Sequence, residues 1–111
     1  MALEFSHVPI GVALVSLDDA KQHLRLTGNA FDAEVLQKRD AAQAHIVAKL
    51  GPAANATWTE ATVPRDIRNA ILILLDAFWE RRGGDEANDT LRKALSTIDF
   101  MLGPHRDPTL A

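Results

Sequence analysis

The sequence predicts an all-α fold, a small bundle of about four helices with a flexible N-terminal leader and C-terminal tail, and three observations support this prediction. Apolar residues recur three and four positions apart along four segments, which is the spacing of one helix face. Gly-Gly or Gly-Pro steps at positions 51–52, 83–84 and 103–104 separate the later segments. No stretch has the convincing alternation of a strand, and no repeat or low-complexity segment is present.

Size and composition limit the classes of protein that the chain can belong to. With 111 residues it forms one domain, near the size at which assembly often adds stability. Its 12 Lys and Arg against 15 Asp and Glu give a net charge of -3, which argues against a general nucleic-acid coating protein but leaves loose contact with DNA open. The absence of cysteine rules out disulfides and thiolate sites and suits a reducing compartment. No secretory signal is evident, and the longest apolar window, Ala70 to Trp79, is too short to span a bilayer, so we expect no membrane partner.

The chain divides into a leader or arm at residues 1–15, a helical domain at 16–104 and a tail at 105–111. Within the leader, Val12 to Val15 form either a short strand or a packing arm. Ser16 caps the first helix, with Asp19 at the third helical position, and Gly28 is expected to end that helix.

The second helix is expected from about residue 30 to residue 50, opened by Asn29 and stopped by Gly51-Pro52. Its inward residues share the spacing of one face: Phe31, Val35, Ala42, Ile46 and Leu50. The fourth helix opens near Asp85, Asn88 or Asp89 and is expected to end at Gly103-Pro104. Its inward residues are Leu91, Ala94, Leu95, Ile98 and Leu102.

The third helix, residues 64–82, is apolar almost all the way round. One face carries Ile67, Ala70, Ile71, Leu74 and Phe78, and apolar residues also lie outside that stripe at Leu72, Ile73, Leu75 and Trp79. Because a short chain can cover one face with its own core, we expect a protein partner to cover the second.

No residue pattern predicts catalysis, a metal or a cofactor. The four histidines lie in separate segments without ligand spacing, and adjacent Asp18 and Asp19 are explained by the start of a helix. Asp76, in an apolar helix, needs a partner, either Arg25 or Arg39 or a residue of another subunit. With no second chemical group to work with it, we expect a protein that is not an enzyme.

Three segments in order form a recognisable series. Leu14 to Leu26 and Asp32 are followed by a long Ala-rich helix, then by Val63-Pro64 through Arg82, and finally by Phe100 to Arg106. The series resembles the small head-tail connector (adaptor) proteins of long-tailed bacteriophages, also labelled as DNA-packaging proteins, over roughly residues 14–106. Two departures are a leader longer than the resemblance needs and His105 in place of the family's Tyr.

The resemblance implies a structural virion protein, a homo-oligomeric ring at the head-tail junction assembled in the bacterial cytoplasm. Its implied partners are the portal protein above it, a tail or head-completion protein below it, and transient non-specific contact with DNA in the channel. A ring joined head to tail needs two different adhesive surfaces on each subunit, and the third helix can supply one. The candidate assembly residues all lie in that helix: Ile73, Asp76, Phe78, Trp79, Arg81 and Arg82.

Three alternatives remain open at this point. The main one is a small helical DNA-binding or DNA-packaging protein similar to a terminase small subunit, although no helix offers a basic recognition face. The others are an enzyme and a generic helical scaffold or chaperone.

Overall fold

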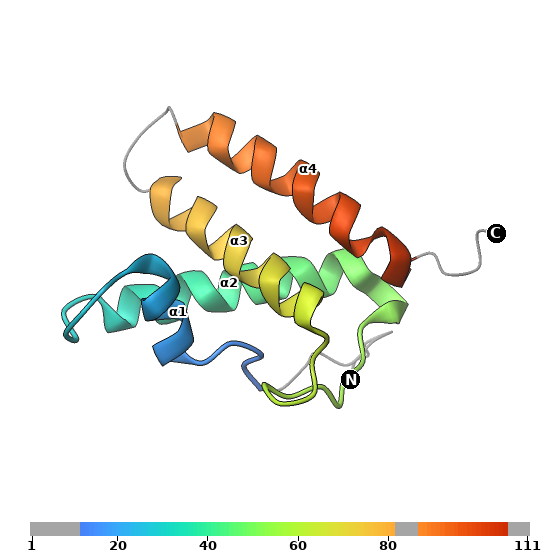
Figure 1. The fold of residues 1–111 in the computed structure, drawn as a ribbon, viewed down its shortest axis with the longest axis horizontal. Helices are drawn as coiled ribbons and strands as arrows, with labels where there is room; N and C mark the ends of the chain where they lie inside the picture. The colour runs from blue at the N-terminus through green and yellow to red at the C-terminus, as the bar shows by residue number, and fades with distance from the viewer. Residues whose placement is uncertain (1–11, 82–86, 107–111) are drawn as a thin grey trace, which may run out of the picture.

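A computed structural model describes residues 12–81 and 87–106, and the all-α prediction is confirmed there: four α-helices and one short 3-10 turn, with no strand (Figure 1). The elements in chain order are α1 (Leu17–Leu24), α2 (Asp32–Leu50), η2 (Gly51–Ala53), α3 (Arg65–Arg81) and α4 (Ala87–Arg106). None of these helices is both long enough and apolar enough to cross a membrane.

Helix α3 is the centre of the bundle. It contacts all three other helices, with α4 beside it and α2 crossing behind it (Figure 1). Four residues of its predicted inward stripe are fully buried: Ile67, Ala70, Ile71 and Leu74. Leu75, which lies outside that stripe, is fully buried as well. The expectation that a partner must cover the second face was therefore wrong at Leu75, because α3 is enclosed by helices of its own chain.

Helix α1 begins as predicted and ends earlier. Ser16 accepts a hydrogen bond from the Asp19 amide at 3.0 Å, which confirms the cap. The helix ends at Leu24, not at Gly28, because Arg25 takes the left-handed conformation (φ 62°) and its amide turns back to Gln22. Left-handed backbone is costly for a residue with a Cβ, so the sequence gave no warning of this ending.

Helix α2 begins later than predicted. Its first residue is Asp32, and Phe31 occupies the cap position without a side-chain cap, so the expected cap at Asn29 does not form. Phe31 was expected to point inward but is 44% exposed. The reason is that Phe31 lies before the helix, where helical spacing no longer sets the direction of a side chain. The other four inward residues of α2 are buried as predicted: Val35, Ala42, Ile46 and Leu50.

The described end of the leader is a packing arm and not a strand. Leu14 and Val15 are fully buried in the core, so the helical body includes residues that were assigned to the leader. Residues 1–11 lie outside the described residues.

Helix α4 continues through Gly103-Pro104 to Arg106, so the predicted ending was wrong and the predicted tail begins two residues too early. Proline removes one amide, and the carbonyl it would have bonded belongs to Phe100, which is on the exposed surface where water can replace that bond. The inward residues Ala94, Ile98 and Leu102 are buried as predicted.

Candidate assembly surface

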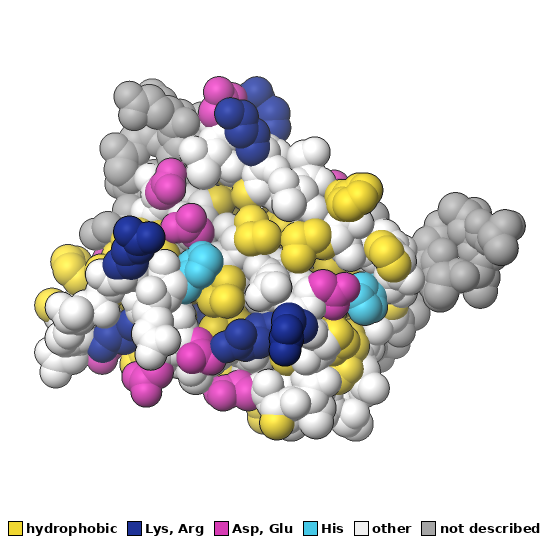
Figure 2. Space-filling model, viewed as in Figure 1, with side chains coloured by type: hydrophobic (Ala, Val, Ile, Leu, Met, Phe, Trp, Pro, Cys, Tyr) yellow, Lys and Arg dark blue, Asp and Glu magenta, His cyan; other side chains and the backbone are white. Residues whose placement is uncertain are grey.

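A stripe along α3 remains only partly covered by the chain itself. Leu72, Ile73, Asp76 and Trp79 follow one another at helical spacing and are all of intermediate exposure; we call these four residues the α3 outer face. Figure 2 shows hydrophobic side chains emerging among charged ones near the centre of the side on which α3 and α4 lie. The α3 outer face thus combines accessible apolar area with a carboxylate, as the core and rim of a protein interface do.

Asp76 has no cationic partner among the side chains that the structure describes. One expected partner, Arg39, instead donates two hydrogen bonds to the neighbouring Asp40, one at 2.8 Å. The other, Arg25, is exposed and forms no ion pair with Asp76. Because Asp76 is only half-buried, water can solvate its carboxylate in the isolated subunit.

Trp79 lies at the edge of the α3 outer face against an aromatic ring from α2. Its ring centroid is 5.9 Å from that of Phe31, in an edge-to-face arrangement with an interplanar angle of 88°. Such pairs contribute about 0.5–1.5 kcal/mol beyond the area they bury. The half-exposed Phe31 ring therefore extends the accessible apolar surface from α3 onto the start of α2.

The remaining candidate residues lie elsewhere. Phe78 is half-buried and packs against the core, four residues after Leu74 on the inward stripe, so it does not share the α3 outer face. Arg81 is the last residue of α3, and its side chain is not described. Arg82 lies outside the described residues. The structure thus brings together three of the six candidates: Ile73, Asp76 and Trp79.

Two polar ties join segments that are far apart in the sequence. Asp19 of α1 forms an ion pair and a hydrogen bond with Arg68 of α3. His105 of α4 lies 2.7 Å from the Asp66 carboxylate of α3, from ring nitrogen Nε2 to oxygen Oδ2. Burial alone would raise the pKa of Asp66, but the hydrogen bond and charge of His105, with the Ile67 amide, outweigh it and leave that pKa lowered. These ties fix α1 and the end of α4 to the same helix.

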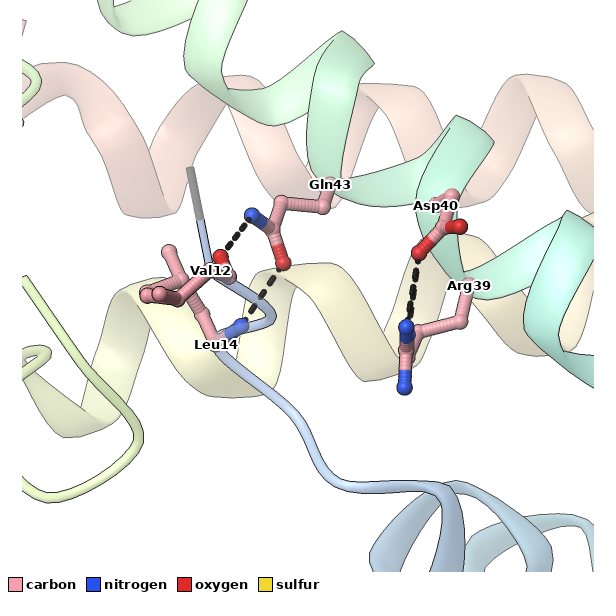
Figure 3. A network of polar contacts seen from close by, with 5 residues as sticks. All are labelled: Val12, Leu14, Arg39, Asp40 and Gln43. Carbon is pink, nitrogen blue, oxygen red and sulfur yellow. Dashed lines mark hydrogen bonds and ion pairs between the residues drawn. The ribbon is translucent and has the colours of Figure 1, made fainter. Parts of the chain in front are cut away.

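Gln43 is the one buried polar side chain of the core, and sequence reasoning missed it. Its Oε1 accepts a hydrogen bond from the Leu14 amide at 2.8 Å, and its Nε2 donates to the Val12 carbonyl at 2.9 Å (Figure 3). One side chain therefore holds the arm by its backbone at two points. A signal was present, since Gln43 precedes Ile46 and Leu50 at the spacing of the buried face of α2.

Phe100 was also missed, and it is the most exposed large hydrophobic residue at 85%. It stands alone on α4 between polar and small neighbours, and single exposed apolar side chains are common on protein surfaces. Among the described residues, no three His, Cys, Asp or Glu side chains come close enough together to hold a metal ion.

Comparison of the chain with protein-family models, with curated proteins and with solved structures found no match.

Proposed function

We propose that this protein is a structural subunit of a phage head-tail connector, one copy of a ring that docks beneath the portal and extends the DNA channel. A tail or head-completion protein would bind the opposite side of the ring. The subunit would assemble in the bacterial cytoplasm and remain in the virion at the head-tail junction.

One observation supports this proposal most directly: the three segments that carry the resemblance contact one another in the fold. The Asp19–Arg68 pair joins the first segment to the second, and the Asp66–His105 pair joins the second to the third. Residues that match a family pattern in separate stretches are expected to meet if the pattern describes one folded unit. His105, where the family has a Tyr, supplies one of these ties.

The α3 outer face supports the assembly part of the proposal. It leaves Leu72, Ile73 and Trp79 half-covered in the subunit, with Asp76 unpaired by described residues. A neighbour that buried this stripe would gain from the apolar area and would need to place a cation opposite Asp76. The net charge of -3 also suits a channel through which DNA slides without being held.

The deciding experiment is mass measurement in solution with negative-stain imaging, with the protein alone and with purified portal rings. Rings of this protein, alone or stacked on the portal, are the expected result. A protein that stays monomeric and never binds a portal would refute the connector. A salt-sensitive gel shift at submicromolar protein would instead favour the DNA-packaging alternative, because phosphate neutralisation makes such binding fall steeply with salt.

Two tryptophan variants test which surface makes the ring. Trp79→Ala truncates the α3 outer face, whereas Trp58→Ala truncates a half-buried ring that packs on the core from the loop before α3. We expect Trp79→Ala to lower the fraction of assembled subunits more than Trp58→Ala does, although both lower thermal stability. Equal loss of stability with unchanged assembly in both variants would assign Trp79 to the core alone.

A further inference from the structure

The arm and α1 form one N-terminal unit, residues 12–24, that rests on the body through a small set of contacts. Gln43 holds the arm backbone, and Leu14, Val15 and Ala20 are fully buried. Asp19 adds the ion pair to Arg68. Apart from the hinge that follows it, the N-terminal unit is fixed to the body by these groups.

The site that receives the arm recognises extended backbone and not a particular side chain. Gln43 is nine-tenths buried, and its amide accepts from one residue and donates to the residue two positions earlier, as the edge of a strand does (Figure 3). The buried space beside it takes the aliphatic pair Leu14 and Val15. Because every copy of the chain carries the same arm, the arm of a second copy satisfies this site as well as the chain's own arm.

The segment between α1 and α2, residues 25–31, has the features of a hinge under strain. Arg25 (φ 62°) and Gly28 (φ 73°) are both left-handed, and Lys21 donates to the Gly28 carbonyl to hold the turn closed. Left-handed backbone at a residue with a Cβ is unfavourable, so straightening this segment releases strain at Arg25. Seven extended residues reach about 23 Å, which approaches the 29 Å short dimension of the molecule.

We propose that neighbouring copies exchange the N-terminal unit, so that residues 12–24 of one copy occupy the Gln43 site of the next. This exchange rests on the proposed function only in that a ring places copies side by side. The Gln43 hydrogen bonds, the buried aliphatic contacts and the Asp19–Arg68 pair form again between copies. Only contacts within the hinge are lost, which is why exchange of an identical element is a low-cost route to assembly.

A cross-linking experiment with isotope labels tests the exchange directly. A photo-reactive amino acid replaces Val12, whose side chain is 49% exposed, in full-length chains prepared with light or heavy nitrogen. The two preparations are mixed unfolded, refolded together at high concentration and irradiated. Exchange predicts peptides that join a light arm to a heavy α2 and the reverse. Cross-links found only between peptides of the same isotope would overturn the proposal, whether the protein is then a monomer or an oligomer.

Two glycine variants test the hinge. Gly28→Ala and Gly51→Ala each place a Cβ on backbone of positive φ, and in both cases the new atom meets nothing within 4 Å. Only Gly28 lies in the hinge, so we expect Gly28→Ala to increase the mixed-isotope product by about fivefold and Gly51→Ala to leave it unchanged. Equal behaviour of the two variants would contradict the role of the hinge.

A charge-reversal mixture provides a measurement without a cross-linker. Asp19→Arg and Arg68→Asp each oppose like charges within one chain, but a mixture of the two restores both pairs if units are exchanged between chains. We expect up to about fivefold more oligomer in the mixture than in either variant alone, the size of a partly exposed pair. A mixture that equals the mean of its components would contradict the exchange, with the double variant as the control for a reversed pair within one chain.

These outcomes separate the exchange from the proposed function. Mixed-isotope cross-links without portal binding would leave the exchange standing and remove the connector. Portal-bound rings with same-isotope cross-links only would leave the connector and remove the exchange.

Discussion

Replacement of Gln43 by Met is the most informative single change for the fold, because Met keeps the length and unbranched shape of the side chain but cannot hold the arm. Two hydrogen bonds are lost, to the Leu14 amide and the Val12 carbonyl. The Leu14 amide belongs to a fully buried residue, so it stays unpaired without an obvious route to water. An unsatisfied buried donor costs about 1–3 kcal/mol.

The expected loss is therefore about 2 kcal/mol of unfolding free energy for Gln43→Met. For a domain of this size, that corresponds to a fall in melting temperature of roughly 8 °C. The assay is thermal unfolding followed by circular dichroism at 222 nm, with urea unfolding as a second measure. Gln37→Met is the matched control, since Gln37 lies on the exposed side of the same helix.

Hydrogen exchange at the Leu14 amide localises the effect. In the wild-type protein the Gln43 carbonyl oxygen protects this amide, so Gln43→Met should accelerate its exchange while amides in the middle of α3 keep their order of protection. A Gln43→Met variant no less stable than Gln37→Met, with unchanged exchange at Leu14, would refute the reasoning that one amide holds the arm.

The remaining predictions concern α3. Leu74→Ala should cost about 3 kcal/mol in urea unfolding because Leu74 is fully buried, whereas Leu72→Ala on the half-exposed side should cost clearly less. Asp66→Asn should lower stability at pH 7 by less than about 1 kcal/mol, since the Asp66–His105 pair is partly exposed. The lowered pKa of Asp66 makes this difference fully present above the unfolded pKa of about 4, and it should vanish as the pH falls through the folded pKa. Urea unfolding at pH 7 and pH 3 measures it, and an equal difference at both pH values would contradict the assignment.

The helices could be predicted because their determinants are local. Apolar spacing and the Ser16 cap act within a few residues, and both are visible in the sequence. The same spacing identified the buried residues of α2 and α4. It failed at Phe31, which carries a helical pattern but lies one residue before the helix.

The surroundings of α3 could not be predicted because they depend on which helices lie beside it. A helix that is apolar all round fits either an interface or the centre of a bundle. The sequence does not state that α1, α2 and α4 all pack on α3, so Leu75 was assigned to a surface that its own chain covers. The surface left for a partner is the narrower stripe that includes Ile73, Asp76 and Trp79.

Gln43 was missed for a related reason. A glutamine at a buried helical position is read from sequence as a neutral interruption, because its partners are backbone groups about thirty residues earlier in the chain. Only the fold shows that the arm passes beside α2. Polar core residues whose partners are backbone atoms leave no complementary residue type in the sequence to find.

The end of α4 shows how distant contacts override a strong local signal. Gly103-Pro104 predicts a helix end because proline lacks an amide and disfavours helical backbone in the residue before it. In the fold, Pro104 faces solvent, while Leu102 is buried and His105 bonds Asp66 on the inner side. The last turn is therefore held on both sides of the proline by contacts with the body. The ending that the local signal predicts is what remains when those contacts are absent, so the final turn of α4 depends on α3 more than on its own sequence.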